Sequence, residues 1–258
     1  MAINVQNLVF DKVLRVAAFK KGTNDYLYGM TQVQDAALNG AAESTDVLDN
    51  VGAKIMTLYR AKTAEFSGAN ALFDLGVLAA QVGTEKKVGA ALVPAFETIE
   101  VGAEATVTLA HTPKGQITEI FALNGDSTLG TRYEGAEAAS GTAFIHVADS
   151  NTITVPTGLA AGTKLFVMYD YEATDAISVI NESNNFPKAV KLVIEALAYD
   201  PCDQNNKILV YITCPNAIMS ADFDVSMAAG ESHSFTYQLQ QDYCSEMKTL
   251  YSVVVVED

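Results

Sequence analysis

From Val93 onward the chain is a succession of short alternating apolar and polar runs, separated by clusters of Gly, Pro, Ser and Asn. β-branched and aromatic residues dominate these runs, and turn signals such as Asn124-Gly125-Asp126 divide them at fairly even spacing. This pattern is typical of a sandwich or barrel of antiparallel strands. The runs in the middle of the chain are 97–101, 106–109, 143–147, 152–155 and 164–171.

The N-terminal third adds a long strand and one helix. Residues 45–48 begin a strand, Asp49-Asn50 with Gly52 indicates a turn, and residues 54–66 alternate in polarity and predict a second strand. Leucines at helical spacing within 71–82, with Asn70 as N-cap and Gly83 just beyond the end, predict the helix. Residues 31–44 are polar, rich in Ala and contain Gly, so we interpret them as a long loop or mobile arm.

The C-terminal quarter returns to strands after an Asn- and Ser-rich linker at 176–186. Alternating runs predict strands over 189–198, 207–213, 221–226, 233–237 and 250–256. The Val253–Val256 run is apolar on both faces, which indicates a central strand or a strand at an interface.

Charge is unevenly distributed along the 258 residues, whose net charge is −15. Residues 1–90 hold 9 basic and 9 acidic residues, residues 91–186 hold 3 and 12, and residues 187–258 hold 4 and 10. Such an acidic chain is unsuited to binding phosphate backbones, which requires clustered Lys and Arg. Solubility is the simplest role for the excess charge.

Neither a secretory signal nor an apolar run long enough to span a membrane is found, so we expect no membrane partner.

The motifs of common enzyme classes are absent from the sequence. His111, His146 and His233 are not in zinc-hydrolase spacing, and no nucleophile elbow or glycine-rich phosphate loop occurs. The odd number of cysteines, at Cys202, Cys214 and Cys244, indicates structural thiols in a reducing compartment.

Three groups of acidic residues partly match the patterns of metal-binding or catalytic sites, but none matches such a pattern in full. Asp46, Asp49 and Asn50 lack the full calcium-loop pattern, and the pairs Asp222/Asp224 and Asp170/Glu172 are typical of solvated strand faces. We therefore predict no enzyme and no catalytic, cofactor-binding or metal-binding residue.

The order of segments resembles the tail tube (major tail) proteins, a family of bacteriophage virion structural proteins. The resemblance extends from about residue 45 to the C-terminus. Its N-terminal segments are Thr45–Asp49, Lys54–Lys62, Glu65–Phe73 and Ala79–Thr84. Its later segments are Leu109–Pro113, Phe166–Tyr171, Asp200–Cys202, Phe223–Val225 and Asp242–Cys244.

The resemblance implies a mainly β fold: a tail-tube-like β-sandwich or barrel with one flanking helix and an inserted small β-sandwich domain. Residues 1–96 and 174–258 would form the tube-forming domain, and 97–173 the insert. The family implies a homo-oligomer of hexameric rings that stack into a phage tail tube and contact other phage tail proteins. DNA would pass through transiently without specific binding. The virion tail would be assembled in the host bacterial cytoplasm.

Two details of that interpretation are hypotheses. Acidic strand residues would line the pore, because an acidic wall lets DNA slide. The 31–44 segment would contact the next ring, so that its deletion leaves folded monomers unable to polymerise. Two other classes remain open: a phage capsid decoration or head protein, and an enzyme or carbohydrate-binding module.

Overall fold

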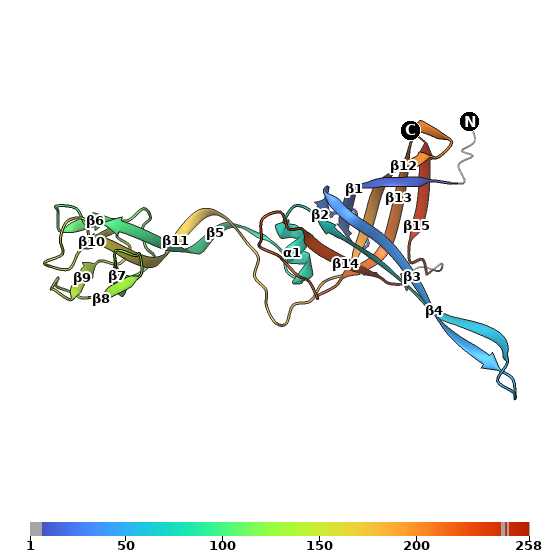
Figure 1. Cartoon of the computed structure of the whole chain (residues 1–258), viewed down its shortest axis with the longest axis horizontal. Coiled ribbons are helices and arrows are strands. Elements are labelled where there is room, and N and C mark those ends of the chain that lie inside the picture. Colours follow the sequence, from blue (N-terminus) through green and yellow to red (C-terminus); the bar gives the residue numbers. More distant parts are fainter. Residues whose placement is uncertain (1–6, 244–245, 247, 258) are drawn as a thin grey trace. The chain divides into compact units, whose positions relative to one another are not determined.

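The computed structural model describes residues 7–243, 246 and 248–257, which are mainly β with one short helix (Figure 1). The mainly β fold expected from the sequence is confirmed. The chain divides into two compact units, Met1–Lys86 with Val179–Asp258, here the main unit, and Lys87–Ser178, here the insert. The sequence-based limits of the insert, 97 and 173, lie inside this division. The two strands that open and close the insert are longer than their apolar runs.

The main unit is built on one antiparallel sheet in the order β2-β1-β12-β13-β14-β4-β3, which curls into a half-barrel (Figure 1). β15 pairs with residues 208–213 of β13 while β14 pairs with 217–219, so the two strands share one edge of β13 end to end. The strands are β1 Val9–Lys20, β2 Tyr26–Met30, β3 Val33–Leu48, β4 Lys54–Asn70, β12 Val190–Asp200, β13 Asp203–Met219, β14 His233–Leu239 and β15 Ser252–Glu257.

Alternation along β12 and along residues 207–215 of β13 places the core on one face of this sheet. Leu192, Ile194, Ile208 and Val210 are buried, while the residues between them are half-buried on the opposite face. Burying each such side chain contributes roughly 1.5–3 kcal/mol relative to leaving it in water. The same core receives Val77 from the helix.

The helix, α1, spans Leu75–Gln81 and begins later than the sequence indicated. The Asp74 carboxylate accepts hydrogen bonds from the backbone N–H groups of Gly76 (2.7 Å) and Val77 (2.9 Å), as an N-cap does. The prediction of Asn70 as N-cap is wrong, because Asn70 is the last residue of β4 and pairs with β14. Gly83 has φ +76 just after the helix, in the left-handed region expected for the C′ position.

Two further local predictions are wrong. Residues 31–44, expected as a loop or mobile arm, lie mostly in β3, which pairs along almost its whole length with β4. Residues 221–226, expected as a strand, are a loop with one isolated bridge from Val225 to His233. Pairing with β4 makes most of 31–44 extended, whereas 221–226 have only the one bridge, and local composition reveals neither outcome.

The insert has its own sheet, in the order β5-β11-β7-β8-β9-β10-β6, and its own apolar core. β5 and β11 pair from Lys87↔Ser178 to Glu100↔Lys164, so the chain enters and leaves the insert through adjacent strands. The core includes fully buried Ile120, Phe144 and Leu165. The strands are β5 Lys87–Glu100, β6 Thr106–Thr108, β7 Glu119–Leu123, β8 Leu129–Gly135, β9 Ala143–His146, β10 Thr152–Thr154 and β11 Lys164–Ser178.

Candidate assembly surfaces

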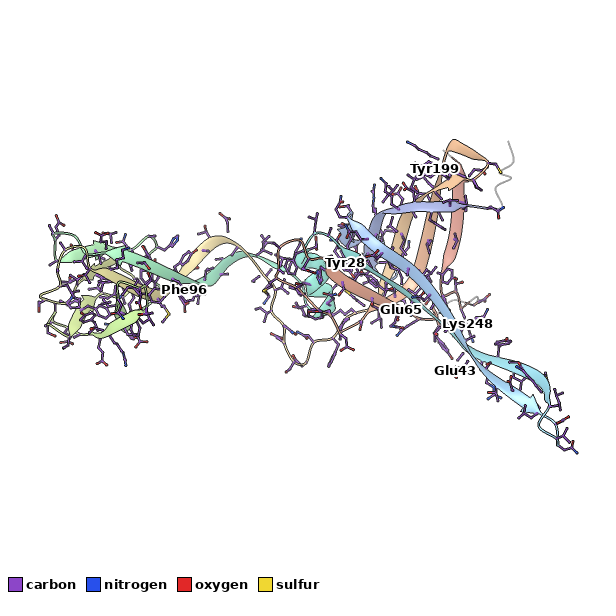
Figure 2. All side chains as sticks on the ribbon, viewed as in Figure 1. Tyr28, Glu43, Glu65, Phe96, Tyr199 and Lys248 are labelled. Atoms are coloured by element: carbon purple, nitrogen blue, oxygen red, sulfur yellow. The ribbon has the colours of Figure 1, made fainter. Side chains whose placement is uncertain are left out.

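The most conspicuous surface of the main unit is a projecting hairpin. β14 pairs with β4 only over residues 64–70, so residues 41–63, here the hairpin arm, extend beyond the sheet as two strands (Figure 1). Glu43 lies on this projecting part and Glu65 lies where the hairpin joins the sheet (Figure 2). The arm therefore exposes both of its faces over most of its length.

The arm carries large apolar side chains that contact little of their own chain. Val51 is 82% exposed, Tyr59 75% and Ile55 63%. Further exposed apolar side chains on the arm are Val47, Leu48, Met56 and Leu58. Large apolar side chains gathered in such number on one exposed element mark a candidate interaction site.

The apex of the arm, residues 46–54, is a well-formed turn. The Asp49 carboxylate accepts hydrogen bonds from the backbone N–H groups of Val51 (2.9 Å) and Ala53 (2.7 Å). Next to it, Asp46 pairs with Lys54 (2.9 Å) and accepts a hydrogen bond from the Thr57 hydroxyl, and these contacts lower the pKa of Asp46. The acidic group that superficially resembled a calcium loop thus shapes a hairpin turn.

β15 presents a second exposed apolar edge. Among the described strands only β13 pairs with β15, so the central position that the valine run allowed is excluded. Val253, Val254 and Val256 are exposed, whereas Val255 packs against the core. An unpaired apolar strand edge is a ready template for another chain. Its role as an interface strand stays a prediction.

Two grooves also lie in the main unit. The first, here the helix groove, has a volume of about 650 Å³ and lies between α1, β2 and the segment around Val190. The second, of about 870 Å³, lies at the base of the hairpin between the start of β1, the start of β3 and the strands of the core.

The three histidines have structural surroundings. The ring of His146 accepts a hydrogen bond at Nδ1 from the Ile117 N–H (3.0 Å) and contacts the Ser150 carbonyl through Nε2 (2.8 Å). His111 stacks on Tyr171 with ring centroids 3.9 Å apart. His233 contacts the Gln81 side chain, and its burial lowers its pKa.

The other acidic pairs noted in the sequence lie on exposed segments. Asp170 and Glu172 lie exposed on β11, and Glu172 pairs with Lys114 at 3.3 Å. Asp222 and Asp224 lie on the 221–226 loop and not on a strand face.

The thiols and the remaining acidic groups form no metal centre in the described part of the chain. Burial raises the pKa of the Cys214 thiol to about 12, Cys202 is exposed, and Cys244 lies outside the described residues. No cluster of metal-ligating side chains is found among the residues that the structure describes. No helix in the described part of the chain is long and apolar enough to cross a bilayer.

Comparison with known proteins gives a family for this arrangement. The profile of the YomU/Tube protein family matches residues 8–253, nearly the whole chain. The chain belongs to the YomU/Tube protein family. No curated protein matches it individually.

Membership of the YomU/Tube family makes the chain a phage tail tube structural protein, as the sequence resemblance implied. Such a protein is non-enzymatic and belongs to the phage tail. The arm, the β15 edge and the grooves are thus candidate surfaces between copies, and not parts of a catalytic site. The sequence predicted the two strands and the turn at the end of the arm, over 45–66, but not that they project beyond the sheet.

Proposed function

We propose that copies of this chain form hexameric rings, that the rings stack into a tube, and that phage DNA passes through the tube into the host. The hairpin arm is the observation that carries the proposal. It exposes large apolar side chains beyond the end of its own sheet. Contact with another copy would remove this surface from water, at roughly 25 cal/mol per Å² of apolar area.

Ring formation would use the open edges of the main sheet. β15 pairs on one side only among the described strands, and β2 ends the sheet at the opposite end of its order. A half-barrel with open edges can extend into neighbouring half-barrels, because closure removes exposed strand edges. A closed ring of copies would therefore satisfy the main-chain groups that a single copy leaves open.

The face of the main sheet opposite its core is the proposed wall of the channel. It carries Glu195, whose carboxylate pairs with Arg15 at 3.2 Å and accepts a hydrogen bond from the Tyr211 hydroxyl at 3.0 Å. It also carries Glu65, which contacts Gln238. The same face also carries Arg15 and Lys191, so Glu65 and Glu195 are the carboxylates that would have to make this wall acidic. The insert alone contributes −7 of the net charge, from 4 basic and 11 acidic residues at 87–178.

Electron microscopy of the purified protein tests the proposal. We expect stacked rings of uniform width with six copies per ring. A reconstruction should place the face of Glu65 and Glu195 on the lumen, and a lumen lined by basic or apolar side chains would exclude the acidic wall. Monomers that bind preformed capsids would instead favour the decoration protein that the sequence left open.

In the virion, the tube would contact other tail proteins at its two ends. The proposed setting is the phage tail, assembled in the host bacterial cytoplasm. DNA passing through the channel would make only transient, non-specific contacts, because the chain has a net charge of −15 and would repel phosphates overall.

A further inference from the structure

We propose that the apex of the hairpin arm of one copy inserts into the helix groove of a second copy. This inference rests on the proposed function and deepens it, because it names the receptor for the arm. The two surfaces lie at opposite ends of the main unit: α1 lies at one end and the apex at the other (Figure 1). Contacts between opposite ends of identical copies are heterologous, and they repeat along a line instead of closing a pair.

The helix groove has an apolar floor. Tyr28, Ala79, Val190 and Met219 line it and are buried. Tyr26 and Leu27 stand on its rim and are 63% and 45% exposed. The groove is therefore apolar where an inserted side chain would rest, and it leaves exposed apolar side chains available at its mouth.

The rim of the helix groove is basic. Lys20, Lys21, Lys86 and Lys188 line it, against one lining carboxylate, that of Glu85. Lys21 also pairs with Asp242 at 3.5 Å. Four of the 16 basic residues of an acidic chain thus gather around one apolar groove.

The apex of the arm has the complementary character. Val47, Leu48 and Val51 are its exposed apolar side chains. Asp46 is neutralised by Lys54, so Asp49 is the carboxylate that leaves the apex with a net charge of −1. Since Asp49 Oδ1 accepts both hydrogen bonds of the turn, this charge is fixed in position. A small apolar knob with one fixed negative charge fits a groove with an apolar floor and a lysine rim.

Charge also decides between the two grooves of the main unit. The larger groove at the base of the hairpin is lined by Asp11 and Asp35 with only Lys12 as a cation. An acidic apex would meet a net negative lining there. The helix groove is the receptor that electrostatic complementarity selects.

A charge swap tests the docking. The variant K86E/K188E reverses two rim lysines that have no carboxylate partner among the contacts of the described residues. The variant D49N/N50K reverses the charge of the apex, while the amide oxygen introduced at position 49 still accepts the two turn hydrogen bonds. We expect each double variant to raise the protein concentration needed for tubes at least tenfold, and the quadruple variant to restore polymerisation. Lys12→Glu in the other groove is the matched control and should leave assembly unchanged.

A photo-crosslinker at Val51 identifies the receptor directly. Benzoylphenylalanine at this position should yield crosslinks between copies to peptides containing 76–86 or 188–190. Crosslinks to the groove at Asp11 and Asp35, or unimpaired assembly of both double variants, would overturn the docking while leaving the tube intact. A wild-type chain that forms no tube would instead refute the proposed function. The crosslink is scored in oligomers of any size, so the docking is decided in that case as well.

Discussion

The Tyr237 hydroxyl donates a hydrogen bond to the hydroxyl oxygen of Tyr28 across 3.2 Å, inside the core of the main unit. The contact joins β14 to β2, which lie far apart in the sequence and are not neighbours in the sheet. Burial raises the pKa of Tyr28 to about 12 and that of Tyr237 well above its usual range. Both phenols are therefore neutral at any physiological pH.

Replacing Tyr237 by Phe should destabilise the main unit by about 1–3 kcal/mol, because the buried Tyr28 hydroxyl loses its partner. Urea-induced unfolding of the monomer, followed by circular dichroism, measures the loss. Tyr59→Phe on the exposed arm is the control and should change stability by less than about 0.5 kcal/mol. Equal effects of the two substitutions would show that the pair contributes nothing specific.

Gly83→Ala should also destabilise the main unit, by about 2 kcal/mol or more. Gly83 has φ +76, and a Cβ there would lie 2.2 Å from the Phe186 carbonyl oxygen. Gly22→Ala is a matched control, because Gly22 has φ +79 but open space around it. The difference between the two thermal midpoints isolates the clash from the backbone strain that both share.

His233 should make the main unit less stable in mild acid. Its pKa is lowered in the fold, mainly by burial, so the unfolded chain takes up the proton first as pH falls below about 6.5. Stability is then full above this pH and decreases until the pH reaches the folded pKa, with a slope of at most about 1.4 kcal/mol per pH unit.

His233→Gln should flatten this slope, since the glutamine amide still donates toward Gln81 but does not titrate. His111→Gln, at an exposed ring, should retain the slope. Denaturant melts of the three proteins between about pH 5 and 8 provide the measurement. An unchanged slope in the His233 variant would assign the acid sensitivity to other groups.

Shortening the arm should abolish stacking without unfolding the chain. The deletion of 31–44 suggested by the sequence would remove most of β3, so the structure calls for a different cut. Residues 44–59 can be replaced by Asn-Gly, which closes a two-residue turn between the paired Glu43 and Arg60. We expect a folded product that forms no tubes, with circular dichroism and monomer melting as the check on folding. Normal tubes from this variant would refute the role of the arm.

The insert should fold by itself when residues 87–178 are produced alone. Its core is formed by its own residues, and β5 and β11 close it with a long ladder that has one register shift, between Ala173 and Ala176. Cooperative thermal unfolding and dispersed amide resonances would support an independent domain. A disordered fragment would mean that 87–178 depends on the main unit.

The sequence predicted those elements whose signal is local. The alternation of 54–66 fits β4, and that of 189–198 fits β12, although both strands extend further. The helix was placed correctly in kind, but Asn70 was preferred to Asp74 as its cap. Both residues suit an N-cap, and only the pairing of Asn70 with β14 decides between them.

The arm and the grooves depend on contacts that the sequence does not display. Residues 33–44 have the Ala- and Gly-containing composition of a loop and are extended because β4 pairs with them. The helix groove gathers Lys20, Lys86 and Lys188 from three separate segments. Residues 1–90 have equal numbers of basic and acidic residues. The sequence therefore did not indicate that several lysines of this segment lie around one groove.

The pairing of Lys87 with Ser178 makes the insert exchangeable. Paired residues of antiparallel strands have Cα atoms about 4.5–5.5 Å apart, so the chain leaves and rejoins the main unit at nearly one point. Any foreign domain whose two ends lie equally close can be grafted there without moving the strands on either side. The inserted domain can thus change, in evolution or by engineering, while the fold of the main unit stays the same.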